Sequence, residues 1–153
     1  MPRFTPAGFR RIVWASALYD LVITAPFATP WSFEWVRAQL SAVNQALGGP
    51  PLAGFDTLQT LLALLMGSLV MVWSVLRLRT PEARLGRYDG AGRLLFSLWM
   101  AWAWSQGGLP VALLFLLPEL AWGVLQAWPV RGEGGGAFGM PQPSFRQDPG
   151  KAA

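Results

Sequence analysis

The sequence contains no cysteine and no histidine. Without cysteine the chain has no disulfide, no thiolate metal site and no thiol nucleophile. Without histidine it lacks the commonest metal ligand and the side chain that most readily changes charge near neutral pH. It also lacks a glycine-rich nucleotide loop, a cluster of metal ligands and a catalytic triad. The sequence therefore predicts no metal and no cofactor, and it does not favour an enzyme.

Charge is scarce as well. Of 153 residues, 13% are charged and 53% are hydrophobic, and that charged share is about half the value typical of a soluble domain. Charge-free stretches alternate with arginine clusters, as expected where lipid excludes charge. The net charge of +4 comes from arginines beside apolar segments, which favours membrane lipids over nucleic acid as partners. The composition therefore indicates a membrane protein.

The predicted fold is all-α: a polytopic membrane protein with one transmembrane domain over residues 1–130. Apolar runs predict four transmembrane helices at about 12–29, 57–76, 93–106 and 110–128. A cleaved signal peptide is the alternative for the first run, but Tyr19 and Asp20 inside it favour a retained helix. Pro26 is expected to kink or end that helix.

An amphipathic helix is predicted between the first two spans, at about 32–47, because apolar residues recur there at helical spacing from Phe33 to Leu47. Ser32 is its expected N-cap, and glycines and prolines at 48–51 are its stop. The segment is too polar to span and is expected at the membrane surface or against the bundle, with an irregular loop as the alternative. The glycine- and proline-rich tail, 131–153, is expected to be disordered and cytoplasmic.

Arginines predict the orientation. Five lie between the second and third spans, in what is expected to be a cytoplasmic loop: Arg77, Arg79, Arg84, Arg87 and Arg93. The charge bias places both termini in the cytoplasm and the protein in a bacterial inner membrane. The same arginines are a candidate site for a phosphate or an anionic lipid headgroup. Small residues every seven positions, Thr60, Gly67 and Ser74, predict a seam for close helix packing.

Two carboxylates fall inside predicted spans. Asp20 and Glu119 each lie about eight residues into a helix, near the bilayer midplane. Both belong to polar stripes that must face the bundle interior, because a charge in hydrocarbon costs about 2.5–3.5 kcal/mol. If the two helices are neighbours, a shared proton or a cation would relieve the repulsion. The candidate ligand-binding residues are Asp20, Glu119, Ser16, Thr24, Tyr19, Gln126, Trp102 and Trp122. In the alternative interpretation, these groups only fix the packing.

The layout resembles a known group. Four short spans, a long segment after the first of them and intramembrane carboxylates among tryptophans resemble, over residues 10–128, the small four-helix bacterial membrane proteins called DoxX-like. The stretches 20–31 and 87–93 read like family signatures. Small multidrug transporters share four helices and an acidic residue in the first. This chain is longer and adds a second carboxylate and an amphipathic insertion.

Three hypotheses for function follow. The first is binding or transport of a proton, cation or amphiphilic ligand at the carboxylates, with tryptophan faces attracting a cation; the protein would then be a homo-oligomer. The second is a non-catalytic subunit or scaffold that holds a partner protein or lipid in the membrane. The third is a membrane-embedded isomerase-like enzyme with one protonated and one ionised carboxyl group.

Overall fold

The structure is a computed structural model that describes residues 3–107 and 109–131. This part of the chain is all-α, and the predicted disordered tail lies outside it from residue 132 onward. Its elements are α1 (Pro6–Thr24), the 3-10 helix η1 (Ala25–Ala28), α2 (Pro30–Ala46), α3 (Thr57–Arg79), α4 (Ala83–Ser105) and α5 (Ala112–Ala127).

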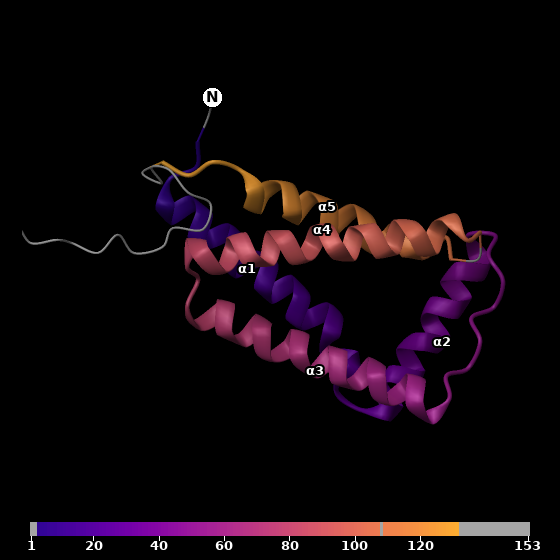
Figure 1. The fold of residues 1–153 in the computed structure, drawn as a ribbon. Coiled ribbons are helices and arrows are strands. Elements are labelled where there is room, and N and C mark those ends of the chain that lie inside the picture. The colour runs from indigo at the N-terminus through magenta and orange to yellow at the C-terminus, as the bar shows by residue number, and fades with distance from the viewer. Residues whose placement is uncertain (1–2, 108, 132–153) are drawn as a thin grey trace, which may run out of the picture.

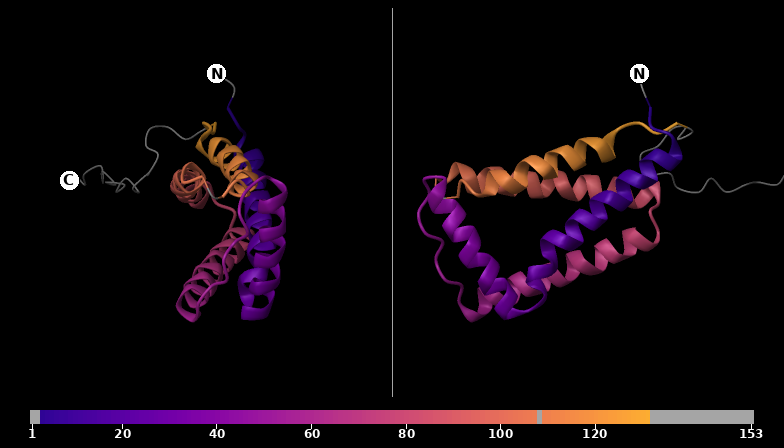
Figure 2. Two further views of the ribbon diagram at one scale, coloured as in Figure 1. Left: turned by 90° about the vertical axis from the view of Figure 1, so that its right-hand side faces the viewer. Right: turned by 180° about the vertical axis from the view of Figure 1, so that it is seen from behind.

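The long helices form two pairs arranged as a V. α1 packs against α3, and α4 packs against α5 (Figure 1). The pairs converge where α1 begins, α3 ends and α4 begins, which we call the narrow end. They separate toward the other end, the wide end, where α2 runs across the gap between them (Figure 2).

At the narrow end a glycine lets two helices pack closely, and the first residues hydrogen-bond to the segment after α5. A Cβ atom on Gly86 would lie 2.5 Å from Val13 Cγ2, so α4 approaches α1 at a distance that only glycine allows. Beside this contact Phe9 and Val13 form an apolar cluster with Val130. The backbone N–H of Phe4 donates to the carbonyl of Pro129 at 3.0 Å. The first residues are therefore tied to the segment after α5.

Asn44 holds the wide end together. Its buried side chain donates to the carbonyl of Pro50 at 2.9 Å and accepts from the backbone N–H of Val111 at 3.0 Å. At the other end of α2, Phe33 packs against Phe27 and Phe55 with ring centroids 5.3 and 5.2 Å apart. α2 is thus a strut between η1 and the turn before α5.

Two helices begin earlier than the spans predicted from the sequence. α1 begins at Pro6 rather than near residue 12, because Thr5 caps it by accepting from the N–H of Gly8 at 3.1 Å and proline fits the first helical position. α4 begins at Ala83 rather than near residue 93. Most of the expected arginine loop is therefore helical, and residues 80–82 alone separate α3 from α4. One face of α4 between residues 86 and 97 is buried, and this packing stabilises the helix. The charged residues in this stretch interrupt the hydrophobic pattern, so the sequence alone does not indicate a helix there.

Other boundaries lie close to the prediction. α1 ends at Thr24 and gives way to η1, where Pro26 stands. α2 begins two residues early, because Thr29 is its N-cap and Ser32 instead completes the capping box. Two helical segments, Pro6–Ala28 and Thr57–Arg79, are long and apolar enough to cross a membrane. α5 is apolar but shorter, and α4 carries charges in its first half.

Candidate functional site

The long helices expose large apolar side chains and bury charged ones, which is the opposite of the usual arrangement in water-soluble proteins. Large apolar side chains on the long helices are exposed, such as Val72, Trp99 and Leu117 at 61–69%. The interior holds polar and charged groups beside a few apolar side chains: Arg77 is completely buried and Arg93 is 3% exposed. Buried charges in proteins are normally paired, because desolvation is costly.

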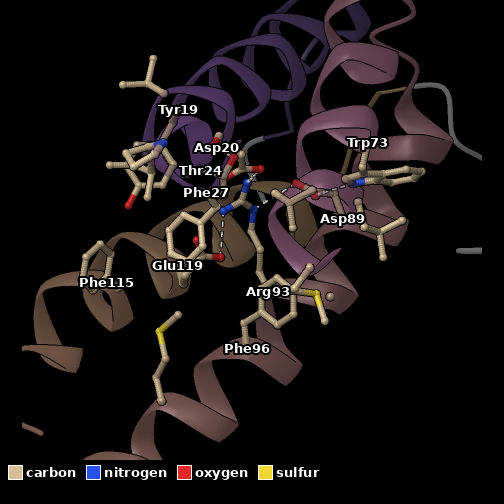
Figure 3. A pocket seen from close by; sticks show the side chains of 18 of the residues that line it. Tyr19, Asp20, Thr24, Phe27, Trp73, Asp89, Arg93, Phe96, Phe115 and Glu119 are labelled. Carbon is tan, nitrogen blue, oxygen red and sulfur yellow. Dashed lines mark hydrogen bonds and ion pairs between the residues drawn. The ribbon is translucent and has the colours of Figure 1, made fainter. Parts of the chain in front are cut away.

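Arg93 joins three helices through its guanidinium group (Figure 3). Nη1 donates to Glu119 Oε2 on α5 at 2.8 Å, and Nη2 donates to Asp20 Oδ2 on α1 at 2.6 Å. Nε donates to Asp89 Oδ2, one turn earlier on α4, at 3.0 Å. All three nitrogens therefore hold a carboxylate, and Asp20 and Glu119 meet through this arginine.

Arg77 brings α3 into the same cluster. Its Nη2 donates to Asp20 Oδ2 at 2.5 Å, and its Nη1 pairs closely with Asp89. The guanidinium carbon also lies 5.6 Å from the centre of the Trp73 ring, a distance at which cation–π attraction operates. The arginine's Nε is buried without a hydrogen-bond partner in the described part of the chain.

Asp89 is the most heavily bonded carboxylate. Its Oδ1 accepts from the indole N–H of Trp73 at 3.0 Å, and its Oδ2 accepts from Gln126 Nε2 at 2.8 Å as well as from Arg93. The amide of Gln126 also donates to Ser16 Oγ at 2.8 Å. We call the set Ser16, Asp20, Trp73, Arg77, Asp89, Arg93, Glu119 and Gln126 the buried network.

The network holds more carboxyl groups than guanidinium groups. Three carboxyl groups face two guanidinium groups, so one formal negative charge is uncompensated when all three carboxyl groups are ionised. Two carboxylate oxygens, Asp20 Oδ1 and Glu119 Oε1, accept no hydrogen bond from any described residue, although Glu119 is only 9% exposed. Within residues 3–107 and 109–131 the acids are not grouped as ligands of a metal ion. The carboxylates converge on arginines instead.

A cavity of about 730 Å³ ends on this network. It lies between the two arms of the V, and its walls are apolar side chains from every helix, including Val36 of α2, Val70 of α3 and Phe115 of α5. Polar groups lie mainly at one end, where Asp20, Arg93 and Glu119 line it (Figure 3).

The predicted binding residues divide into three groups. Asp20, Glu119, Tyr19 and Thr24 line the cavity, while Ser16 and Gln126 belong to the network behind it. Trp122 does not line the cavity but packs on Tyr19, with ring centroids 6.2 Å apart. Trp102 is 58% exposed, nine residues beyond Arg93 on α4, and does not line the cavity.

The expected group of five arginines does not exist as one cluster. Arg77 and Arg93 are buried in ion pairs, because both face carboxylates across the bundle. Arg87 donates to the carbonyl of Gln126 at 2.6 Å, near the C-terminal end of α5, and lies over the ring of Phe9. Arg79 and Arg84 are exposed at the narrow end. Similarly, the guanidinium group of Arg93, rather than a shared proton or a small cation, lies between Asp20 Oδ2 and Glu119 Oε2.

Asp89 and Trp73 were missed as members of the site. Asp89 precedes residue 93, where the third span is predicted to begin, so the apolar run alone does not place Asp89 inside the bundle. The spacing of Gly86, Asp89, Gly90, Arg93 and Ser97 does follow one helical face, and this signal could have identified it.

No family model, curated protein or solved structure matches this chain.

Proposed function

We propose that this chain is a multi-pass protein of a bacterial inner membrane that binds a cationic or amphiphilic ligand midway across the bilayer. Four helices, α1, α3, α4 and α5, would span the membrane. The exposed apolar exterior and the charged interior support this arrangement, because in lipid the apolar surface needs no cover and charges must turn inward.

The positions of the arginines support the orientation. Arg10, Arg11, Arg79 and Arg84 are exposed where α1 begins, α3 ends and α4 begins, at the narrow end. The turn between α4 and α5 at the wide end has no Lys or Arg. Under the positive-inside rule the narrow end and both termini lie in the cytoplasm.

The observation that carries the ligand proposal is the cavity, which ends on a network with three carboxyl groups and two guanidinium groups. An isolated negative charge in a medium of low dielectric is costly, and a bound cation removes that cost. Glu119 Oε1 and Asp20 Oδ1 supply acceptors toward the ligand that the arginines leave free.

Matched hydrophobic ions test this proposal. The purified protein in lipid nanodiscs would be titrated with tetraphenylphosphonium and with tetraphenylborate, which share a shape and differ in the sign of the charge, with tryptophan fluorescence as the readout. We expect the protein to prefer the cation by at least about tenfold, or about 1.4 kcal/mol.

Glu119→Gln should abolish that preference, because it balances the network while leaving an oxygen for Arg93 Nη1. Glu34→Gln, on the exposed face of α2, is the matched control and should keep the preference. Equal affinity for both ions in the wild-type protein, or an unchanged preference in Glu119→Gln, would refute the proposal.

A structural subunit or scaffold is the second candidate. The nearly complete pairing of the guanidinium groups favours it, since such a network can fix helix packing without a ligand. The isomerase-like hypothesis receives no comparable support, because Arg93 occupies the space between the carboxyl groups of Asp20 and Glu119 that a substrate would need. The DoxX-like resemblance stays a prediction.

A further inference from the structure

The cavity has an opening between two helices that follow each other in the chain. α3 and α4 are joined by residues 80–82, and beyond the contacts of Asp89 with Trp73 and Arg77 they hardly touch, since α3 packs on α1 and η1 and α4 packs on α5. Cavity-lining residues on both sides of this gap are exposed: Met66 and Leu69 on α3, and Tyr88 and Phe96 on α4. If α3 and α4 span the bilayer, the opening faces hydrocarbon rather than water.

We infer that the ligand is a long-chain amine already dissolved in the bilayer, which enters sideways between α3 and α4 and places its ammonium group against Glu119 and Asp20. This inference rests on the proposed function and specifies its ligand class and its route. The apolar walls match an alkyl chain, and Asp20, Arg93 and Glu119 line the part of the cavity where the headgroup would lie.

The headgroup follows from charge and hydrogen bonding. An ammonium group carries three donors and one positive charge. It matches Asp20 Oδ1 and Glu119 Oε1, which accept no hydrogen bond from the described residues, and the one negative charge that is uncompensated when all three carboxyl groups are ionised. A fatty acid or an anionic phospholipid would add a second uncompensated negative charge beside the first, and a neutral lipid would leave the excess in place.

Gly92 offers a way to fill the cavity without disturbing the fold. It lines the cavity next to Arg93, and a Cβ atom there would have no neighbour within 4 Å. A phenylalanine at this position would occupy the space of the alkyl chain. Ala91, the neighbouring residue, is exposed and does not line the cavity, so Ala91→Phe is the matched control.

The experiment uses two spin-labelled lipids in nanodiscs: a C18 primary amine and a C18 fatty acid with the nitroxide at the same carbon. We expect the wild-type protein to immobilise the amine at least about tenfold more strongly than the acid. Gly92→Phe should lose this immobilised fraction and Ala91→Phe should retain it. Thermal unfolding of both variants would establish that they are folded.

Equal immobilisation of amine and acid, or an unchanged amine signal in a folded Gly92→Phe, would overturn the inference. The titration with tetraphenylphosphonium distinguishes failure of this inference from failure of the proposed function. If the protein prefers the phosphonium ion but does not immobilise the amine, the proposed function stands and the long-chain ligand is wrong. If it does neither, both proposals fail.

Discussion

The narrow and wide ends of the bundle are built by different means. At the narrow end, Gly86 and Gly90 let α4 approach α1 and α5 closely, and behind them the buried network links all four long helices. At the wide end the helix pairs separate, and α2 bridges them through Asn44 and a few aromatic contacts. The difference explains the cavity: the network fixes where the helices meet, and the strut keeps them apart beyond that point.

The largest effect is expected at the network. Arg93→Met leaves carboxylates on three helices facing each other with only Arg77 between them, so the free energy of unfolding should fall by about 3–5 kcal/mol. Thermal unfolding in detergent measures the loss. Arg84→Met, an exposed position on the same helix, should change stability by less than about 0.5 kcal/mol. Similar stability of the two variants would mean that the network does not hold the bundle together.

A pair of glycine substitutions tests the close packing at the narrow end. Gly86→Ala places a methyl group 2.5 Å from Val13 Cγ2 and should destabilise the protein by about 1–3 kcal/mol. Gly92→Ala adds the same group where there is room, and the higher helix propensity of alanine should stabilise by about 0.5–1 kcal/mol. Opposite signs in the two melting temperatures are the expected result, and equal shifts would argue against the narrow contact.

At the wide end, Asn44→Ala removes the side-chain hydrogen bonds to the carbonyl of Pro50 and the N–H of Val111, and it leaves that N–H buried without this partner. The expected cost is about 1–3 kcal/mol. Hydrogen exchange should accelerate in α2 and in the turn before α5 but not in α3. Gln45→Ala, at the exposed neighbouring position, is the control. Faster exchange throughout the bundle would show that α2 is not a separate strut.

The smallest effect concerns pH and the surface of α2. The hydrogen bond from Arg37 lowers the pKa of Glu34 below its ordinary value of 4.5. A lowered pKa in the folded state stabilises the protein above the ordinary pKa, and this contribution disappears as the pH falls through the lowered value. Wild-type protein should therefore melt slightly higher than Glu34→Gln at neutral pH, and the difference should shrink as the pH falls below 4.5. A difference that does not change with pH would contradict this assignment.

The sequence predicts those features that depend on local pattern. The all-α class, the amphipathic segment and the inward direction of Asp20 and Glu119 follow from hydrophobic periodicity and from the cost of charge in lipid. The start of α4 could not be predicted in this way, because Asp89 and Arg93 are stabilised by Arg77, Gln126 and Glu119 from other helices. Five arginines close together in the sequence predict a solvated loop. Arg77 and Arg93 are buried only because they form ion pairs with carboxylates of other helices.

Cysteine accessibility tests the central claim that lipid covers the apolar exterior. The natural chain has no cysteine, so single variants Leu62→Cys on α3, Leu117→Cys on α5 and Gln45→Cys on α2 can be labelled one at a time in cell membranes. A water-soluble maleimide should label Gln45→Cys readily. It should leave Leu62→Cys and Leu117→Cys unmodified until detergent is added, although both positions are more than half exposed in the isolated protein. Labelling of those two cysteines in intact membranes at the rate of Gln45→Cys would contradict the account.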